Sequence, residues 1–272
     1  MYMHHLLESL KGDVWQLSSN LDHLLGLILT LQDTTIMLHT NGAMSSQSMA
    51  RIQALEIDNN ISIPEAGVTL LKDAPHEIYL YEGTMSHRDI CIEINFTEAA
   101  ETLCISFDLT LENQAFINLI TKLVAKVWPL HSHKSVRDKY APNCHCCLEK
   151  QEELRKDTSS HPLSKILLNL EEATHLKLTH SGQFSHSVQE FQYCSQSTHW
   201  GIVYLHAGTR QYSIDLTQVY SLHARVDIFK GRPQTVLTGF NAHGHKILEL
   251  AQEGMSALHQ WENELKTATP SR

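Results

Sequence analysis

The segment Thr235-Val-Leu-Thr-Gly-Phe240-Asn241 has a counterpart 133 residues earlier in the chain, Thr102-Leu-Cys-Ile-Ser-Phe107-Asp108. The same separation carries Trp128 onto Trp261 without a gap. Self-similarity at a nearly constant separation is typical of an internally repeated fold. The pair of segments therefore indicates that the chain contains two copies of one unit.

Two further matches lie upstream of this pair. Ile78-x-Leu80 falls over Ile214-x-Leu216, and Ile36-x-Leu38 falls over Leu176-x-Leu178. Their separations, 136 and 140 residues, shrink steadily toward the C-terminus. A few short changes of loop length between two copies would produce this trend.

Each copy has a pattern of strands between helices. Residues 76–81, 90–94 and 201–205 alternate between apolar and polar side chains, which is typical of half-buried antiparallel strands. Asn41-Gly42 and Ser181-Gly182 are turn sequences between such strands. Antiparallel sheets are therefore expected in both copies.

Helices are expected at the ends of each copy. Leucine-rich opening helices are expected over residues 6–31, with a break near Ser18, and over residues 163–172. The closing helices carry apolar residues on one face: Leu119, Leu123 and Val127 in the first copy, and Met255, Leu258, Trp261 and Leu265 in the second. Residues 43–48 are mostly small and polar, and they are interpreted as a loop.

These patterns predict an α+β fold, a tandem duplication of a unit in which helices pack on an antiparallel sheet. The first repeat is expected to span residues 1–130, and the second residues 161–272. Residues 131–160 are expected to be a connector, because the apolar patterning stops there and mixed charges surround Pro142. A short helix is expected within it, over residues 149–156.

The composition excludes several classes of protein. With 272 residues, 42% hydrophobic and 19% charged, the chain is globular rather than disordered. Its net charge of −9 argues against a general nucleic-acid binder. The longest apolar stretch, residues 24–31, is too short for membrane insertion, and the N-terminus lacks the pattern of a secretory signal. Six cysteines without scaffold spacing indicate reduced thiols and a cytoplasmic location.

The densest group of soft metal ligands is Cys144-His145-Cys146-Cys147, with His131 and His133 upstream. Zinc sites commonly take four such ligands from two separated pairs. Here a single compact group occurs, and adjacent side chains cannot easily turn toward one ion. We favour an ordinary connector with oxidisable thiols and expect no bound metal, while a zinc-binding regulator remains an alternative.

Common catalytic motifs are absent from the sequence. It contains no G-x-S-x-G, no Walker loop, no G-x-G-x-x-G and no H-E-x-x-H. Their absence weakens a hydrolase, kinase or dehydrogenase interpretation and leaves the question of enzymatic activity open.

A histidine with a nearby arginine occupies matching places in the two copies. His87-Arg88 and His223-Ala-Arg225 each stand at the start of a strand after a loop. A haem site needs an axial ligand, commonly histidine, and cationic groups for the propionates. The same residues could instead be polar edge-strand positions that block aggregation.

The second half then resembles a known family. Its successive segments are Leu163-Ser-Lys-Ile-Leu-Leu-Asn-Leu, Leu176-Lys-Leu-Thr-His-Ser-Gly182, His199-Trp-Gly-Ile-Val-Tyr204, Tyr212-Ser-Ile-Asp-Leu216 and Thr235-Val-Leu-Thr-Gly-Phe-Asn-Ala-His-Gly-His-Lys-Ile-Leu248. Together they resemble the repeat of the HemS/ChuS/ChuX hemin-utilisation proteins, in which a helix precedes a short strand, a Trp-containing strand and a strand ending in Phe-Asp-x-x-Gly-x-x-Ile. The likeness covers residues 163–266 and, more faintly, residues 6–128.

This resemblance implies a bacterial cytosolic haem-binding protein for haem trafficking or utilisation. Some family members cleave the porphyrin with an electron donor, so an enzyme of this kind would be a haem-degrading oxygenase. The HemS branch places its axial histidine in an Asp-Val-His-x-Phe-Phe segment between the repeats, and this connector has no such segment. If haem is the cofactor, the expected binding residues are therefore His223, Arg225, His87 and Arg88.

A second interpretation remains open, a non-enzymatic protein-interaction module that keeps the haem-utilisation fold without binding haem. The expected partners are accordingly haem as ligand or another protein, with no nucleic acid and no membrane insertion. The chain is expected to be a monomer or a homodimer.

Overall fold

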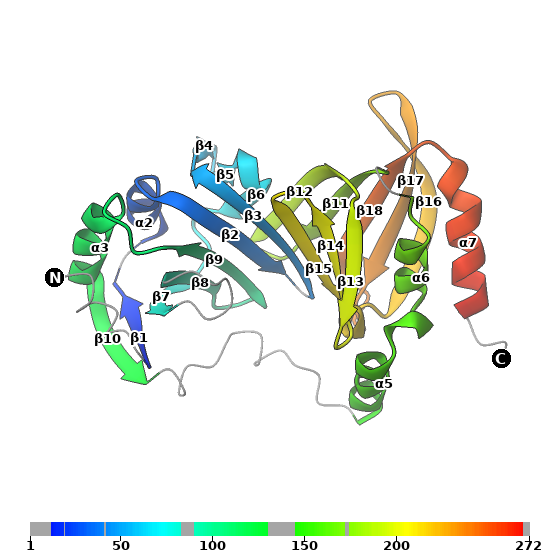
Figure 1. Ribbon diagram of the computed structural model, residues 1–272, viewed down its shortest axis with the longest axis horizontal. Helices are drawn as coiled ribbons and strands as arrows, with labels where there is room; N and C mark the ends of the chain where they lie inside the picture. The colour runs from blue at the N-terminus through cyan, green and yellow to red at the C-terminus, as the bar shows by residue number, and fades with distance from the viewer. Residues whose placement is uncertain are drawn as a thin grey trace. The chain divides into compact units, whose positions relative to one another are not determined.

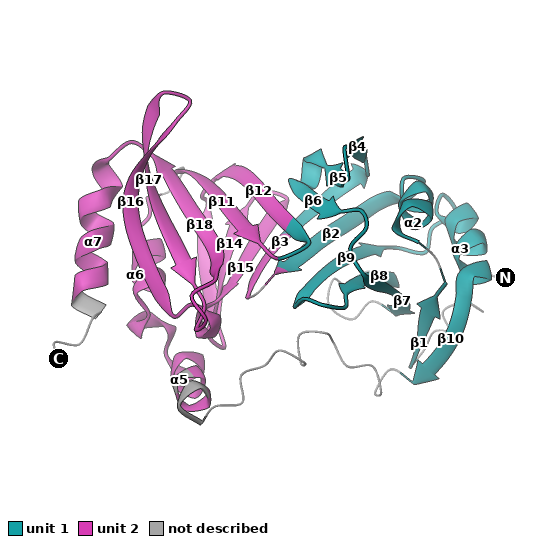
Figure 2. Ribbon diagram, turned by 180° about the vertical axis from the view of Figure 1, so that it is seen from behind, with its two compact units in different colours: residues 1–39, 46–141, 183–185 teal, residues 40–45, 142–182, 186–272 magenta. Residues whose placement is uncertain are grey.

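The computed structural model describes residues 12–18, 20–40, 42–82, 90–129, 145–171 and 174–268. The chain divides into two compact units (Figure 2). Unit 1 comprises residues 1–39, 46–141 and 183–185; unit 2 comprises residues 40–45, 142–182 and 186–272. Both are built mainly from antiparallel strands with few helices, which confirms the α+β prediction.

Unit 1 contains one large and one small group of strands (Figure 1). Its elements are β1 (Asp13–Leu17), α2 (Leu21–Ile28), β2 (Gln32–Thr40), β3 (Ala43–Arg51), β4 (Leu55–Ile57), β5 (Asn60–Ile63), η1 (Pro64–Ala66), β6 (Val68–Leu71), β7 (His76–Glu82), β8 (Ile90–Phe96), β9 (Glu101–Phe107), α3 (Gln114–Ile120), η2 (Thr121–Leu123) and β10 (Val124–Pro129). The strand order is β10-β1-β7-β8-β9-β2-β3 in the large group and β6-β5-β4 in the small one.

The core of unit 1 lies between these strands and two short helices. Helix α2 begins after Asn20, whose side chain accepts a hydrogen bond from the backbone N–H of His23 at 2.8 Å. Its buried residues are spaced along one face, at Leu21, Leu24 and Ile28. They pack in one apolar cluster with the inward residues of β7, β8 and β9.

A buried carboxylate fixes the short segment 183–185 within unit 1. Glu101 is fully buried, and its side chain accepts hydrogen bonds from the backbone N–H groups of Gln183 and Phe184 and from the Ser185 hydroxyl. The Phe184 ring lies 6.0 Å from that of Phe96, between centroids. A buried charge is tolerated when several donors satisfy it, as they do here.

Unit 2 combines a five-stranded and a three-stranded group. Its elements are α5 (His145–Lys156), η4 (Thr158–Ser160), α6 (Pro162–Leu168), β11 (His175–Ser181), β12 (Ser185–Gln192), β13 (Ser195–His199), β14 (Ile202–Ala207), β15 (Arg210–Asp215), η5 (Leu216–Gln218), β16 (Ser221–Phe229), β17 (Arg232–Phe240), β18 (Lys246–Glu253) and α7 (Ser256–Ala268). The strand orders are β16-β17-β18-β11-β12 and β15-β14-β13.

Helices α6 and α7 lie on the same side of the five-stranded group (Figure 1). Helix α6 begins at Pro162, and the buried His161 caps it: the backbone N–H of Leu163 donates to His161 Nδ1 at 3.1 Å. His161 Nε2 lies 3.1 Å from the carbonyl oxygen of Val219. Trp261 of α7 is fully buried in the same core.

The N-terminal helix prediction is wrong over the described residues. Residues 13–17 form strand β1, and only residues 21–28 are helical. Strand β1 pairs with β7 and β10 on its two sides, so sheet pairing prevails over the leucine-rich composition. Residues 6–11 lie outside the described part of the chain.

The closing helix of the first half is shorter than predicted. It ends at Ile120, and Val127 and Trp128 belong to strand β10. Trp128 lies opposite Val14 of β1, whereas Trp261 is helical, so the two tryptophans do not occupy equivalent elements. Apolar spacing over a short window fits both a helix face and a strand, and pairing with β1 selected the strand here.

The predicted loop at residues 43–48 is also wrong, because these residues belong to strand β3. Its buried positions are the small or polar Ala43, Ser45 and Gln47. Ser45 donates a hydrogen bond to the Ser187 hydroxyl at 3.0 Å. The inward face is hydrogen-bonded rather than apolar, so the sequence shows no hydrophobic alternation.

The order of elements is the same in the two halves of the chain. Eight consecutive strands, β2 to β9, lie between helices α2 and α3. Eight consecutive strands, β11 to β18, likewise lie between helices α6 and α7. We propose that the halves arose by duplication, and this shared order supports the proposal. Residues 145–160, expected in the connector, form α5 and η4 and belong to unit 2.

Candidate functional site

The candidate site is the face of β16, β17 and β18 that is turned away from α6 and α7. Residues at alternate positions of these strands share this outer face, and His223 and Arg225 of β16 both belong to it. His223 lies opposite Thr238 of β17, which in turn lies opposite Glu249 of β18. The pairing brings one imidazole, one hydroxyl and one carboxylate into a single row.

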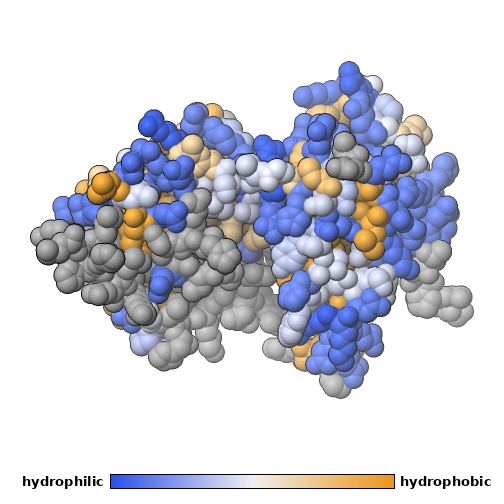
Figure 3. All heavy atoms as spheres, in the orientation of Figure 1, coloured by the Kyte–Doolittle hydropathy of each residue, from blue (hydrophilic) through white to orange (hydrophobic). Residues whose placement is uncertain are grey.

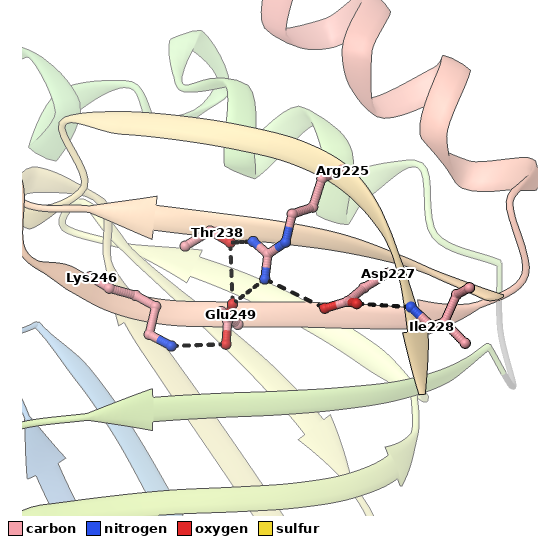
Figure 4. A network of polar contacts seen from close by, with 6 residues as sticks. All are labelled: Arg225, Asp227, Ile228, Thr238, Lys246 and Glu249. Carbon is pink, nitrogen blue, oxygen red and sulfur yellow. Dashed lines mark hydrogen bonds and ion pairs between the residues drawn. The ribbon is translucent and has the colours of Figure 1, made fainter. Parts of the chain in front are cut away.

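A charged network around Arg225 and Glu249 occupies this face (Figure 4). Arg225 donates hydrogen bonds from Nη1 to the Thr238 hydroxyl at 2.5 Å and from Nη2 to Glu249 Oε1 at 2.8 Å. Lys246 Nζ lies 3.0 Å from Glu249 Oε2, and Asp227 lies 3.9 Å from the Arg225 guanidinium. Glu249 is thus held between two cations, one on each carboxylate oxygen.

The electrostatics of Glu249 follow from this geometry. Partial burial raises the pKa of its carboxyl, but hydrogen bonds and charge from Arg225 and Lys246 outweigh burial and hold the pKa below its ordinary value. Glu249 is therefore a carboxylate at neutral pH. Its negative charge offsets part of the positive charge of Arg225 and Lys246 on this face.

His223 remains exposed at the edge of the network. Its ring meets the Phe240 ring edge-on, with 5.3 Å between centroids. A shallow, open hollow lies on the other side of β16, against α7. The lining comes from β16 and α7: Leu222, His223, Ala224, Glu262, Leu265 and Lys266. An accessible imidazole next to an aromatic ring can ligate a metal centre.

Two of the four predicted binding residues, His87 and Arg88, lie outside the described residues, as does Cys144. The structure brings His223 and Arg225 onto one face, as their spacing on a strand requires. Within the described ranges, no group of three His, Cys, Asp or Glu side chains could hold a metal ion. No helix there is long and apolar enough to cross a membrane.

Sequence reasoning missed Thr238, Lys246 and Glu249. All three lie on β17 or β18. The partners of Arg225 depend on the register of β16, β17 and β18, which the local sequence does not specify. The single acidic residue Glu249 within the otherwise apolar run 247–251 was the available signal. On the face seen in Figure 3, the surfaces of α5 and α7 are mainly hydrophilic.

The sequence matches no protein-family model and no curated protein. Solved structures with a similar fold exist. ChuS, the heme degrading enzyme of Escherichia coli O157:H7, superposes with a TM-score of 0.67 at 9% identity, covering 97% of this chain and 90% of ChuS. Apo-PhuS, a heme-binding protein from Pseudomonas aeruginosa, gives 0.64 at 10% identity, covering 96% and 89%.

Holo-PhuS gives the same TM-score of 0.64 at 10% identity and covers 98% of this chain. ChuS and PhuS therefore each match this chain over nearly its whole length, and the match covers most of their own chains. The resemblance that the second half predicts is confirmed at the level of the fold: the chain has a HemS/ChuS-like fold.

Proposed function

We propose that this protein binds haem and serves cytosolic haem trafficking or utilisation. The observation that carries the proposal is a histidine and an arginine two residues apart on the outer face of β16, in a fold shared with holo-PhuS. The fold alone does not assign a function, because one fold can host many sites. The chemistry of the outer face supplies the second support.

The residues present suit the parts of a haem. A neutral imidazole such as that of His223 can ligate ferric iron, and a guanidinium such as that of Arg225 can hold a propionate in a bidentate contact. Phe240, whose ring meets that of His223, offers a contact for the porphyrin ring. His87 and Arg88 remain proposed binding residues by their sequence pattern.

Glu249 sets a condition on this function. Both Arg225 and Lys246 are engaged by its carboxylate, so a propionate has to compete with Glu249 for them. When a propionate replaces the Glu249 carboxylate, Arg225 and Lys246 keep their charge-assisted hydrogen bonds. The exchange therefore costs little free energy if the released Glu249 carboxylate is hydrated. Glu249 should therefore weaken haem binding without abolishing it.

Haem degradation is a further part of the proposal. It requires haem, dioxygen and an electron donor, and the axial ligand would come from the protein. Anaerobic and aerobic incubation of the haem-loaded protein with ascorbate tests it. Loss of the Soret band only in air, with catalase present, indicates enzymatic ring cleavage; an unchanged band indicates a carrier.

The experiment for haem binding is a Soret titration with hemin. Because the chain has 19 histidines, nonspecific adsorption is a concern, and saturation at one haem per chain is required. His223→Ala should weaken binding and shift the band, and Arg225→Ala should weaken binding with little shift. His199→Ala removes an exposed histidine on β13 and is the matched control.

A protein-interaction module is the second candidate, and one observation favours it. The end of the β16–β17 hairpin exposes two large apolar side chains, Ile228 at 73% and Phe229 at 41%. Absence of saturable hemin binding by the full chain would favour this alternative.

A further inference from the structure

The second face of β7, β8 and β9 in unit 1 is polar and largely buried. Three rows of residues cross the strands in register: Tyr81, Cys91 and Ser106; Tyr79, Glu93 and Cys104; Glu77, Asn95 and Thr102. The opposite face of the same strands contributes the apolar core. The proposed haem residues include none of these side chains.

Two thiols lie side by side in these rows. Cys91 is opposite Ser106, and Cys104 is opposite Glu93, so the two cysteines occupy diagonal positions on one face of neighbouring strands. Their side chains hydrogen-bond to each other, and neither cysteine is in a disulfide. Their exposed fractions are only 5% and 7%.

A polar network surrounds the two thiols. Glu93 accepts hydrogen bonds from the Tyr81 hydroxyl at 2.7 Å and from Asn95 Nδ2 at 2.5 Å. The Asn95 side-chain oxygen accepts from the Thr102 hydroxyl at 2.8 Å. A cysteine that only fills space behaves as a small apolar residue, whereas these two stand among hydrogen-bonding groups.

The surroundings also favour the reactive form of one thiol. The hydrogen bond from the Cys104 thiol lowers the pKa of Cys91, and this effect outweighs burial, which raises it. The thiolate is the nucleophilic form of cysteine, so a lowered pKa increases its fraction near neutral pH. Cys104 is then both the neighbour that promotes the thiolate and a thiol within its reach.

We propose that Cys91 and Cys104 are a peroxide-oxidised pair that forms a reversible disulfide. The Cys91 thiolate attacks hydrogen peroxide, which leaves a sulfenic acid on Cys91 and, after protonation of the departing hydroxide, one water. The Cys104 thiol then attacks the Cys91 sulfur and displaces the second water. Two thiols are oxidised, and one peroxide is reduced to two waters.

The diagonal placement predicts that the bond is easily reversed. Diagonal residues of an antiparallel pair have Cα atoms about 7–8 Å apart, beyond the usual span of a disulfide. The strands therefore have to shift slightly to close the bond. Strain of this kind raises the reduction potential and makes the disulfide labile to thiols.

The experiment uses the full chain, reduced and desalted, and titrated with hydrogen peroxide. The samples are denatured, labelled with N-ethylmaleimide and digested with trypsin. Cys91 and Cys104 fall on one tryptic peptide, residues 89–122, while Cys144, Cys146 and Cys147 fall on residues 140–150. The expected product is peptide 89–122 lighter by two hydrogens and without label, restored to double labelling by dithiothreitol. Cleavage at Glu93 then locates the bridge.

Cys194→Ser, which removes an exposed thiol elsewhere, is the control and should leave the bridge intact. Cys91→Ser and Cys104→Ser should each abolish it. If either variant fails to fold, the wild-type peptide decides the matter alone. Full labelling of both cysteines while Cys194 is oxidised overturns the proposal, as does over-oxidation of Cys91 with Cys104 still labelled.

Discussion

Arg225 of β16 and Glu249 of β18 are 24 residues apart in sequence and 2.8 Å apart between Nη2 and Oε1. The strand between them contributes Thr238, whose hydroxyl contacts both side chains. The predicted propionate-binding arginine is thus already paired with an internal carboxylate. Haem binding at this face becomes a competition between two carboxylates for one guanidinium.

Glu249→Gln should tighten hemin binding, because the neutral amide holds Arg225 and Lys246 less firmly. A partly exposed ion pair is worth about 1 kcal/mol or less, so the expected gain in affinity is about fivefold. Soret titration of both proteins measures it. Glu253→Gln removes the carboxylate of the exposed Arg232–Glu253 pair and should leave the affinity unchanged. Equal gains in the two variants would mean only that net charge matters.

The lowered pKa of Glu249 also predicts a pH dependence of stability. A carboxyl with a lower pKa in the folded state stabilises the fold above its ordinary pKa and loses that contribution as the pH falls through its folded value. The wild type should therefore exceed Glu249→Gln in free energy of unfolding at neutral pH. Urea unfolding at a series of pH values should show the difference shrinking as the pH falls below the ordinary pKa of a glutamate. A difference that persists there points to packing instead.

Glu101→Gln should strongly destabilise unit 1. The side-chain amide keeps one acceptor oxygen and replaces the other by an NH₂ group, so one of the two positions that accept from Gln183, Phe184 and Ser185 becomes a donor facing a donor. The expected loss in free energy of unfolding is about 3 kcal/mol. Urea denaturation measures the loss, and Glu98→Gln, at an exposed position three residues earlier, should change it little. Comparable stability of the two variants would contradict the role given to Glu101.

Gly42→Ala should destabilise unit 2 more than Gly208→Ala. Both glycines have positive φ, +97° and +62°. A Cβ at position 42 would lie 2.6 Å from Gln218 Cβ, whereas position 208 has open space. The left-handed conformation alone costs an alanine about 1–2 kcal/mol, so only Gly42→Ala should exceed this range in thermal or urea unfolding. Equal losses would show that the contact with Gln218 relaxes.

The sequence predicted those parts of the fold in which local pattern and tertiary packing agree. Residues 76–81 and 90–94 alternate and form β7 and β8, and the helix expected from Leu163 is α6. The short helix expected over residues 149–156 is the C-terminal part of α5. In each of these segments the apolar spacing or the local propensity favours only one type of secondary structure.

Other parts depend on partners that are remote in sequence. Strand β3 buries Ser45 against Ser187, and β10 pairs with β1. The hydrophobic pattern of each of these segments alone therefore does not indicate a strand. The candidate site divides in the same way. The placement of His223 and Arg225 on one face follows from their spacing, whereas the pairing of Arg225 with Glu249 follows from the register of three strands.

Hemin titration of the wild type beside His223→Ala tests the central claim most directly. Haem binding at the outer face of β16 predicts saturation at one hemin per wild-type chain, weaker binding with a shifted Soret band for His223→Ala, and no change for His199→Ala. Indistinguishable titrations of wild type and His223→Ala would contradict the assignment of the site. A wild type without any saturable Soret change would contradict haem binding itself.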